Sequence, residues 1–572
     1  MPVMRQEAQN FASPEFKSDS PKTLSTIVDC FKPKRVPTMQ AQDSNVTGNL
    51  KESMTSMGSS IFQNVIRELT VICLRAIGLR SRNRMPHKIR RVAVVGAGPA
   101  GAIATDALVK EGAFDTIRVF DRRSAVGGTW IHTPHLPPGI PSLERLVSGE
   151  ADNEVTIPGN LPAVTTISEA VNSHQHRFSD TPIHENLHSN IAPDIMSYTQ
   201  EPFPKKLSQK TLAEYGPDSL FRHHSAVREW IEGIFSRGGH DKLLELETTV
   251  ERVEKENGEW VITLRKVLKG RNYWWRETFD AVVVASGHYN VPWFPKVEGL
   301  LEFDRRFPGA IHHSKHFREG SKYRGKKRVI VVGASVSSIE IIHEILDVVD
   351  GQVYASIRDQ PIPAFGWVPF EHPKIAIKPA IQRFDPETGR VHFTDGSYLD
   401  NIDHIIYGTG YTFSFPFIPA VQKRVKNAYR RLPGVYQHTW NIEDPTLTFV
   451  GMLGGGFTFR AYEWQSVAIA RFLASRAKAL PSIPEQLEWE RQRVNEKRGG
   501  KDYYSIAPDY EGFFEYLRNI AGEPAQGTNG RKLPAFDPQW LVIWGNMVAP
   551  RSESWRRKRN EAESKLELKS KL

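Results

Sequence analysis

Two stretches of the chain share one order of apolar and polar positions. Residues 90–123 begin with an apolar run, continue through a glycine turn and a helical stretch, and end with a second apolar run at Asp121. Residues 326–359 repeat this order, with the turn at Gly333 and the second run ending near Arg358. A buried strand, a tight turn, a helix and a second strand form one unit of a parallel sheet. The pattern therefore predicts an α/β fold with two Rossmann-like units.

The first turn has the spacing of a dinucleotide-binding loop, G-x-G-x-x-G. Gly96 permits the tight turn, Gly98 lets the backbone approach a pyrophosphate, and Gly101 lets the helix pack closely on the strand. A pyrophosphate would lie at the positive N-terminus of the helix, and the Asp121 carboxylate would accept hydrogen bonds from a ribose diol. The predicted contact residues are Gly96, Ala97, Gly98, Pro99, Ala100, Gly101 and Asp121.

The second turn departs from this spacing, because Ser335 and Ser338 stand where the second and third glycines would be. Its second strand ends at Arg358, 25 positions after Gly333, the same separation as from Gly96 to Asp121. A carboxylate would repel the extra phosphate of NADP, whereas an arginine pairs with it. The second unit is thus predicted to bind NADPH, unless Arg358 is only a solvated cation. The predicted contacts are Gly333, Ala334, Ser335, Val336, Ser337, Ser338, Ser356 and Arg358, with the Ser356 hydroxyl as an added donor.

The segment after Asp121 identifies the first nucleotide. It reads RRSAVGGTWIH, in which paired glycines would let the chain pass against a second part of the ligand and Trp130 offers a flat face. A simple NAD site needs neither feature, but a flavin does. The first unit is therefore predicted to bind FAD, with Gly128, Thr129 and Trp130 as further contacts.

Charge and cysteine content narrow the classes of protein. The formal charge is +10, from 75 Lys+Arg against 65 Asp+Glu, which suits an anionic ligand or an anionic membrane surface. Nothing beyond this charge indicates nucleic acid. Cys30 and Cys73 are the only cysteines, so no disulfide framework is implied and the environment is expected to be reducing, hence cytoplasmic.

The N-terminal extension, residues 1–88, is expected to be largely disordered because its first 60 residues are polar and lack periodicity. Residues 61–80 form a helical apolar stripe that Arg67, Glu68 and Arg75 interrupt, so a transmembrane span is not expected. Two interpretations stay open for this helix. Together with the basic residues up to 91 it would lie peripherally on a membrane, or it would pack on the protein.

The chain resembles a flavin-containing monooxygenase of the FAD- and NADPH-dependent class B, over about residues 89–480. Besides the two turns, HENLHSNIAPDIMSY resembles the family segment whose asparagine, here Asn190, lies beside the flavin. The stretch FPGAIHHSKHF fits the family pattern F-x-G-x-x-x-H-x-x-x-F/Y at Phe307, Gly309, His313 and Phe317. DHIIYGTGYTFSFPF resembles the ATGY segment with Gly408 in place of alanine, and LTFVGMLGGGFTFRAYEWQSVAIARFLA is similar to the late strand and helix of the flavin site.

The same spacing bears on the three clustered histidines, His312, His313 and His316, which by their number suggest a metal site. Only His313 falls on a family position, and the other histidines of the chain show no repeated ligand spacing. We therefore expect no metal, and we interpret this stretch as the connection between the two nucleotide-binding units.

The resemblance implies a reaction. NADPH reduces FAD, reduced FAD adds O₂ to form a C4a-hydroperoxide that bound NADP⁺ shields, and a nucleophilic nitrogen or sulfur of a small molecule takes one oxygen atom. Asn190 would then bond the nicotinamide amide or steady the hydroperoxide. From the residues alone, it could instead cap a turn before Pro193. Loops that depart from the detoxifying members favour a fungal-type enzyme of secondary metabolism.

Four other classes of protein share some of these features. A pyridine-nucleotide disulfide oxidoreductase needs a redox-active cysteine pair near the flavin, and both cysteines precede the first strand. A Baeyer–Villiger monooxygenase acting on a ketone has tryptophan where this chain has Phe317. An N-hydroxylase of an amine or amino acid shares the ATGY-like segment and stays open. The fourth is a nucleotide-binding protein without turnover.

The resemblance also implies a domain arrangement in which the NADPH domain is inserted in the FAD domain. We predict FAD-domain segments at 89–321 and 405–480, an NADPH domain at 322–404, and a C-terminal helical extension and tail at 481–572. A polar insertion at about 135–185 is expected near the substrate entrance.

Overall fold

The computed structural model describes residues 88–571, apart from positions 138, 168–177, 179, 429 and 498. The expected helix at 61–80 and the rest of residues 1–87 lie outside the described residues, as does part of the predicted insertion at 135–185. None of the helices in the described ranges is both long and apolar enough to cross a membrane.

A seven-stranded sheet contains the first nucleotide-binding unit and has the order β19–β20–β21–β8–β1–β2–β4. β1 pairs in parallel with β2 and β8, so that Val94 lies opposite Val119 and Val283. β4 and β21 extend the parallel part, and β19 and β20 form an antiparallel edge. The strands are β1 (Arg91–Val95), β2 (Thr116–Phe120), β4 (Leu244–Glu245), β8 (Ala281–Val284), β19 (Val435–Tyr436), β20 (Trp440–Asn441) and β21 (Leu447–Phe449).

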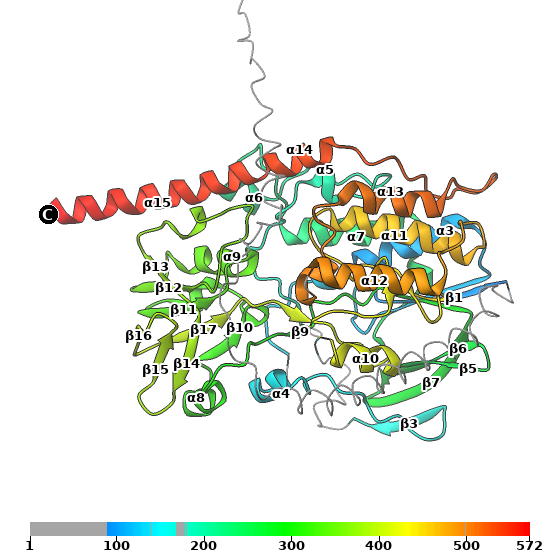
Figure 1. Ribbon diagram of the computed structural model, residues 1–572, viewed down its shortest axis with the longest axis horizontal. Helices are drawn as coiled ribbons and strands as arrows, with labels where there is room; N and C mark the ends of the chain where they lie inside the picture. The colour runs from blue at the N-terminus through cyan, green and yellow to red at the C-terminus, as the bar shows by residue number, and fades with distance from the viewer. Residues whose placement is uncertain are drawn as a thin grey trace, which may run out of the picture. The chain divides into compact units, whose positions relative to one another are not determined.

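The alternation of side chains along β1 determines what covers each face of this sheet. Val92 and Val94 belong to a core shared with three helices, α3 (Pro99–Glu111), α7 (His224–Arg237) and α11 (Thr458–Leu473). Ala93 and Val95 point the other way, into a core shared with a four-stranded antiparallel sheet. That second layer consists of β3 (Ala163–Thr166), β5 (Thr248–Glu256), β6 (Glu259–Leu268) and β7 (Arg271–Phe279) (Figure 1).

The second unit forms a separate, fully parallel sheet with the order β10–β17–β11–β12–β13. Helix α9 (Val336–Ile345) covers one face, and α8 (Leu300–Arg306) with the hairpin strands β14 (Ile381–Asp385), β15 (Arg390–Phe393) and β16 (Tyr398–Leu399) covers the other. The five strands are β10 (Ile311–His313), β11 (Arg328–Val332), β12 (Gln352–Ser356), β13 (Ile375–Lys378) and β17 (His404–Tyr407).

All strands of the second sheet fall between β8 and β19 of the first along the chain. This confirms the predicted α/β class, with one Rossmann-like domain inserted in the other. The sheet runs from Ile311 to Tyr407, and the exact boundaries predicted for its domain, 322–404, stay a prediction.

The two chain segments that connect the domains pair with each other. β9 (Val291–Pro292) and β18 (Tyr411–Thr412) form a two-stranded antiparallel ribbon. The Trp293 amide also donates to the Gly410 carbonyl, at 2.9 Å. The inserted segment therefore leaves and re-enters the first domain at one place.

The C-terminal part of the described chain is helical. α13 (Tyr510–Ala521) and α14 (Gln539–Asn546) join the core around α11, and the long helix α15 (Val548–Lys571) runs beside the second sheet (Figure 1). The other helical elements described are α4 (Leu143–Ser148), α5 (Pro193–Met196), α6 (Gln209–Tyr215), α10 (Pro419–Lys426), α12 (Ile483–Lys497) and the 3₁₀ turns at Gly128–Trp130, Asp241–Leu243, Ser314–His316, Gly320–Tyr323, Val368–Phe370 and Gly500–Tyr504.

Candidate functional site

The first turn has the geometry that its glycines predict. Gly96 adopts a φ of +109°, and a Cβ there would lie 2.5 Å from the Ala285 carbonyl oxygen. A Cβ at Gly101 would lie 1.8 Å from the Gly96 carbonyl oxygen, so only glycine lets α3 begin so close to β1. Helix α3 has Gly98 at its N-cap and no side-chain cap, which leaves the backbone N–H groups of its first turn available to an anion.

The paired glycines after Asp121 pack directly on this turn. A Cβ at Gly128 would lie 2.6 Å from the Gly98 Cα, and the Gly127 amide donates to the Ala97 carbonyl at 3.0 Å. The short 3₁₀ turn that follows contains half-buried Thr129 and Trp130. The predicted FAD contacts from residues 96–101 and 128–130 are thus brought together.

Asp121 closes the other side of the turn. Its carboxylate is buried and accepts hydrogen bonds from the amides of Ala97 and Arg123, each at 2.8 Å. Each oxygen of a carboxylate can accept two hydrogen bonds, so acceptor capacity for a ribose diol remains. The two protein bonds hold the carboxylate in one orientation at the end of β2.

Asn190 lies on a segment that is attached to the first turn. Its side chain is exposed, and α5, which begins three residues later, has Ala192 at its N-cap and no side-chain cap. The structure therefore does not support a capping role for Asn190. Further along, the buried Tyr198 hydroxyl donates to the Pro99 carbonyl at 2.7 Å, in the first turn of α3.

The other end of this segment contacts the second domain. The side-chain Nδ2 of Asn186 donates to the Glu344 carboxylate of α9 at 2.7 Å, and the backbone amide of Glu185 donates to the Arg318 carbonyl at 3.0 Å. Residues 185–198 thus connect the two domains, and Asn190 lies between these contacts.

Histidines surround this segment and are held neutral. Burial, aided by neighbouring cations such as Arg318, lowers the pKa of His184 to about 3, and burial lowers the pKa of His224 to about 3 and of His188 to about 4. Burial also lowers the pKa values of His132 and His223. These imidazoles are therefore uncharged donors and acceptors at neutral pH, rather than cations beside the site.

The second turn repeats the geometry of the first with serines. Gly333 adopts a φ of +118°, and α9 begins after Ser335, which makes no side-chain cap. Ser338 is buried, and its hydroxyl lies 3.4 Å from the Val332 carbonyl oxygen and 3.3 Å from that of Gly408. A Cβ at Gly408 would lie 2.0 Å from the Ser338 Oγ, so the glycine in place of the family's alanine leaves room for the serine.

The strand-end residues of the second unit differ in exposure. The Arg358 side chain is 77% exposed, and its Nε donates to the Asp359 carboxylate at 2.7 Å. Ser356 is buried and its hydroxyl donates to the Pro379 carbonyl at 2.9 Å, a bond it would have to exchange in order to donate to a phosphate. Arg358 is thus the more accessible of the two.

The three clustered histidines diverge. The Lys315 amide donates to the His313 Nδ1 at 3.1 Å, the His312 Nε2 lies 2.6 Å from the Tyr323 hydroxyl, and the His316 Nε2 lies 3.8 Å from Asp180. Residues 311–313 form β10, which pairs with β17 in the second sheet. No group of three or more potential metal ligands occurs in the part of the chain that the structure describes.

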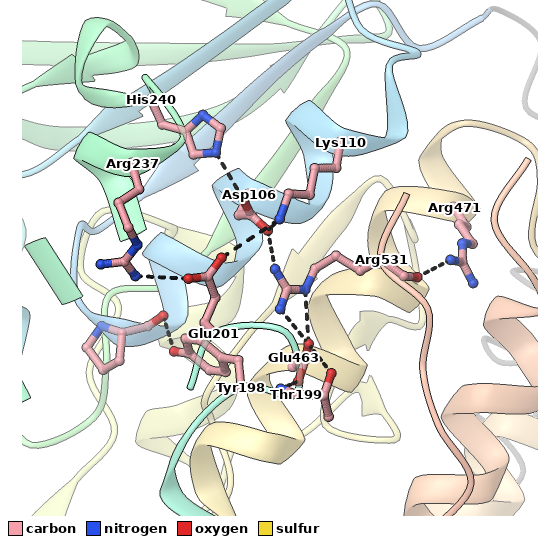
Figure 2. A network of polar contacts seen from close by, with 11 residues as sticks. Asp106, Lys110, Tyr198, Thr199, Glu201, Arg237, His240, Glu463, Arg471 and Arg531 are labelled. Carbon is pink, nitrogen blue, oxygen red and sulfur yellow. Dashed lines mark hydrogen bonds and ion pairs between the residues drawn. The ribbon is translucent and has the colours of Figure 1, made fainter. Parts of the chain in front are cut away.

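A buried ionic network beside α3 was not predicted from the sequence (Figure 2). Arg531 donates to Glu463 of α11 at 2.8 and 2.9 Å and to Asp106 of α3, and all three side chains are almost fully buried. Glu463 also accepts from the Thr199 amide at 2.7 Å. The sequence does contain one indication of this network, a carboxylate on an apolar face of both α3 and α11. Buried carboxylates are nearly always paired, so such positions indicate a buried partner.

These features fit two dinucleotides. One uncapped helix N-terminus lies beside a fixed carboxylate, which suits the pyrophosphate and ribose of FAD, and the Gly128–Trp130 turn packs on it. The other lies beside an exposed arginine, which suits the 2′-phosphate of NADPH.

Comparison with known proteins supports a flavoprotein whose first unit is Rossmann-like. A family model described as flavin-binding monooxygenase-like matches residues 173–361 and 372–526, more than half of the chain. A model of an NAD(P)-binding Rossmann-like domain matches residues 94–146.

Individual relatives extend the likeness over most of the chain. The flavin-containing monooxygenase iboF of Amanita muscaria is 29% identical over 498 residues, which cover 78% of this chain and 91% of that protein. The flavin-containing monooxygenase ustF2 of Aspergillus flavus is 26% identical over 493 residues, covering 79% and 95%. Among solved structures, S-allyl-L-cysteine S-oxygenase from Allium sativum shares the fold, with a TM-score of 0.62 at 23% identity over 84% of this chain and 99% of that one.

Proposed function

The chain belongs to the flavin-binding monooxygenase-like family and is an FAD-dependent monooxygenase that uses NADPH, and we propose that it transfers one oxygen atom from O₂ to a nucleophilic nitrogen or sulfur of a small molecule. We place that molecule among the intermediates of secondary metabolism. N-hydroxylation of an amine or amino acid falls within this proposal.

One observation carries the proposal. Residues 185–198 are attached to the FAD turn by the hydrogen bond from Tyr198 to Pro99 and to the NADPH-domain helix α9 by the hydrogen bond from Asn186 to Glu344. We infer that a segment held at both ends in this way would keep Asn190 between the two predicted dinucleotide sites. Its exposed carboxamide can both donate and accept hydrogen bonds there.

The protein's own contribution is to bind, orient and exclude water. When bound and reduced, FAD supplies the activated oxygen. Asp121 and the uncapped start of α3 would hold FAD, Arg358 and the start of α9 would hold NADPH, and Asn190 would bond the nicotinamide amide. The neutral histidines around Asn190 add no charge that would attract water to this region.

The last residue of the FPGAIHHSKHF stretch, Phe317, supports oxygenation of a nitrogen or sulfur over oxygen insertion beside a ketone. Phe317 stands where ketone-oxidising relatives of this class have tryptophan. It is buried, stacks on Tyr323 with ring centroids 5.7 Å apart, and meets the His184 ring edge-on at 5.4 Å. A larger indole at this position would have to displace one of these rings.

A product screen tests the proposal. The purified protein should carry FAD and oxidise NADPH faster when its substrate is present. Mass spectrometry of reactions with amines, thioethers, thiols and ketones should show the gain of one oxygen atom on a nitrogen or sulfur compound. A protein that carries no flavin, or that oxygenates ketones alone, would contradict the proposal.

A further inference from the structure

The junction between α14 and α15 lies against residues 185–198, the segment that contains Asn190 (the Asn190 segment). The Ala192 amide, two residues after Asn190, donates to the Met547 Sδ, which stands between the two helices. On the same side, Trp544 of α14 packs against Phe457, with ring centroids 5.6 Å apart. The start of the C-terminal helix is thus anchored on the FAD domain.

One turn later the same helix is anchored on the NADPH domain. Arg551 donates to the Glu340 carboxylate of α9 at 2.9 Å, and the two side chains are only 6% and 17% exposed. Arg551 also lies over the Phe221 ring of the FAD domain, 5.1 Å from its centroid. Four residues on, Trp555 stacks on His343 of α9 at 5.4 Å and meets Phe365 edge-on at 4.9 Å.

The helix that Arg551 contacts is the one that begins at the NADPH turn. Glu340 lies four residues after Val336, the first residue of α9, so the ion pair is formed about one turn from the predicted phosphate-binding end. Met547 and Arg551 are likewise one turn apart. A single turn of the C-terminal helix therefore connects the Asn190 segment to the NADPH turn.

Besides the Asn186–Glu344 hydrogen bond, the two domains face each other here across a cavity. A polar cavity lies between residues 184–188, α9 and the first turns of α15, and His184, Glu344 and Arg551 are among the residues that line it. Among the residues that the structure describes, neither ring nitrogen of His184 nor the Nε of Arg551 has a hydrogen-bond partner. Because the interior is polar and incompletely packed, we expect the contacts of the helix to act together with the Asn186–Glu344 hydrogen bond in holding the spacing.

We propose that Arg551 is a positioning residue for NADP(H): through Glu340 it sets the distance between the NADPH turn and Asn190, so the C-terminal helix belongs to the cofactor-binding machinery. This inference rests on the proposed function. Helices α14 and α15 lie beyond residue 526, where the match to the family model ends. The contacts of Arg551 are therefore a property of this chain rather than of the matched region.

Other charged groups face the pair and determine what a substitution does. Glu214 and Glu344 line the same cavity from α6 and α9, and Lys558 lines it from α15. Burial, together with the Glu214 charge, raises the pKa of Glu340, while Arg551 opposes that rise. Without Arg551 the Glu340 carboxylate would lose its counter-ion and face the Glu214 carboxylate of α6, so we expect α9 to shift relative to the first domain.

Charge reversal tests the proposal. Arg551→Glu and Glu340→Arg should each raise the dissociation constant of NADP⁺ about tenfold, the loss that corresponds to a coupling of about 1.4 kcal/mol. Each should also speed amide hydrogen exchange in α9 and in residues 185–192, and increase hydrogen peroxide release per NADPH oxidised. The double variant should recover at least half of each effect. Arg556→Glu, an exposed arginine on the same helix, is the matched control.

These measurements distinguish a positioning role of Arg551 from a general loss of stability. They also distinguish a failure of this inference from a failure of the proposed oxygenation reaction. If a reversal variant fails to fold, Arg551→Met is measured in its place. Unchanged NADP⁺ affinity in a folded single variant, or a double variant no better than the singles, would overturn the role of Arg551. Hydrogen exchange and NADP⁺ affinity need no turnover, so a failed product screen would leave this test intact.

Discussion

The hydroxyl oxygen of Ser338 occupies the space that a side chain at Gly408 would need. The two residues are 70 positions apart, yet a Cβ at Gly408 would lie 2.0 Å from the Ser338 Oγ. Each is a departure from the pattern of similar monooxygenases, one a serine for glycine in the NADPH turn and the other a glycine for alanine in the ATGY-like segment. The structure shows that each departure accommodates the other.

Gly408→Ala should therefore damage the NADPH site by itself. The methyl group would push Ser338 and the start of α9 away from β17, at a cost of about 1–3 kcal/mol. We expect NADPH affinity to fall about tenfold or more and the melting temperature to drop. Adding Ser338→Gly should restore both, because the nearest remaining atom, the residue 338 Cα, is 3.2 Å away. Fluorescence titration with NADPH measures the affinity, and a double variant no better than Gly408→Ala would contradict compensation.

Arg358→Ala should change the choice between NADPH and NADH. A charge-assisted bond to the 2′-phosphate contributes about 1.5–3 kcal/mol, so kcat/KM with NADPH should fall about tenfold to a hundredfold. NADH lacks that phosphate, so its kcat/KM is the internal control and should change little. Equal losses with both nucleotides would show that Arg358 acts in some other way.

Tyr198→Phe should weaken FAD binding. The substitution removes a buried hydrogen bond to the Pro99 carbonyl and so loosens residues 185–198 from the first turn, at a cost of about 1 kcal/mol. We expect at least a fivefold rise in the FAD dissociation constant, measured by titrating FAD into the apoprotein. Tyr398→Phe, on an exposed strand of the inserted domain, should have no effect. An unchanged FAD affinity in Tyr198→Phe would refute the link.

Stability should fall steeply as the pH drops below about 6.5. The pKa values of His184 and His224 are lowered in the fold from 6.5 to about 3, so these residues bind protons mainly when the chain unfolds. Their stabilising contribution is complete above pH 6.5 and is lost as the pH falls, at about 1.4 kcal/mol per pH unit for each histidine.

Thermal melts between pH 7.5 and 4.5 measure this dependence. His184→Asn should reduce the slope of stability against pH, while the exposed His135→Asn should leave it unchanged. The same slope in the wild type and in His184→Asn would exclude His184 as a contributor.

The two nucleotide-binding units could be predicted because short-range patterns specify them. Gly96 and Gly333 lie between a strand and a helix, and the strand-end residues Asp121 and Arg358 follow at equal spacing. The contact of Ser338 with Gly408 could not be predicted, because each residue by itself only indicates a small side chain. Their proximity depends on the parallel pairing of β11 with β17.

The ionic network behind the FAD turn was predictable only in part. Asp106 and Glu463 are carboxylates on apolar helices, which indicates buried partners. Their common partner, Arg531, lies in a polar stretch between helices with no periodic pattern, so nothing local assigns it. The same limit applies to Arg551, whose role depends on where a distant helix crosses α9.

The pairing of β9 with β18 determines where the inserted segment could be added to the chain or removed from it. Because Pro292 and Tyr411 are direct neighbours in the β9–β18 ribbon, the whole inserted segment begins and ends at adjoining points. A short turn joining these strands would, in chain geometry, remove the segment without moving any strand of the seven-stranded sheet. In chain order the inserted segment is therefore one unit, which a single insertion between two paired strands would add to the domain of the seven-stranded sheet.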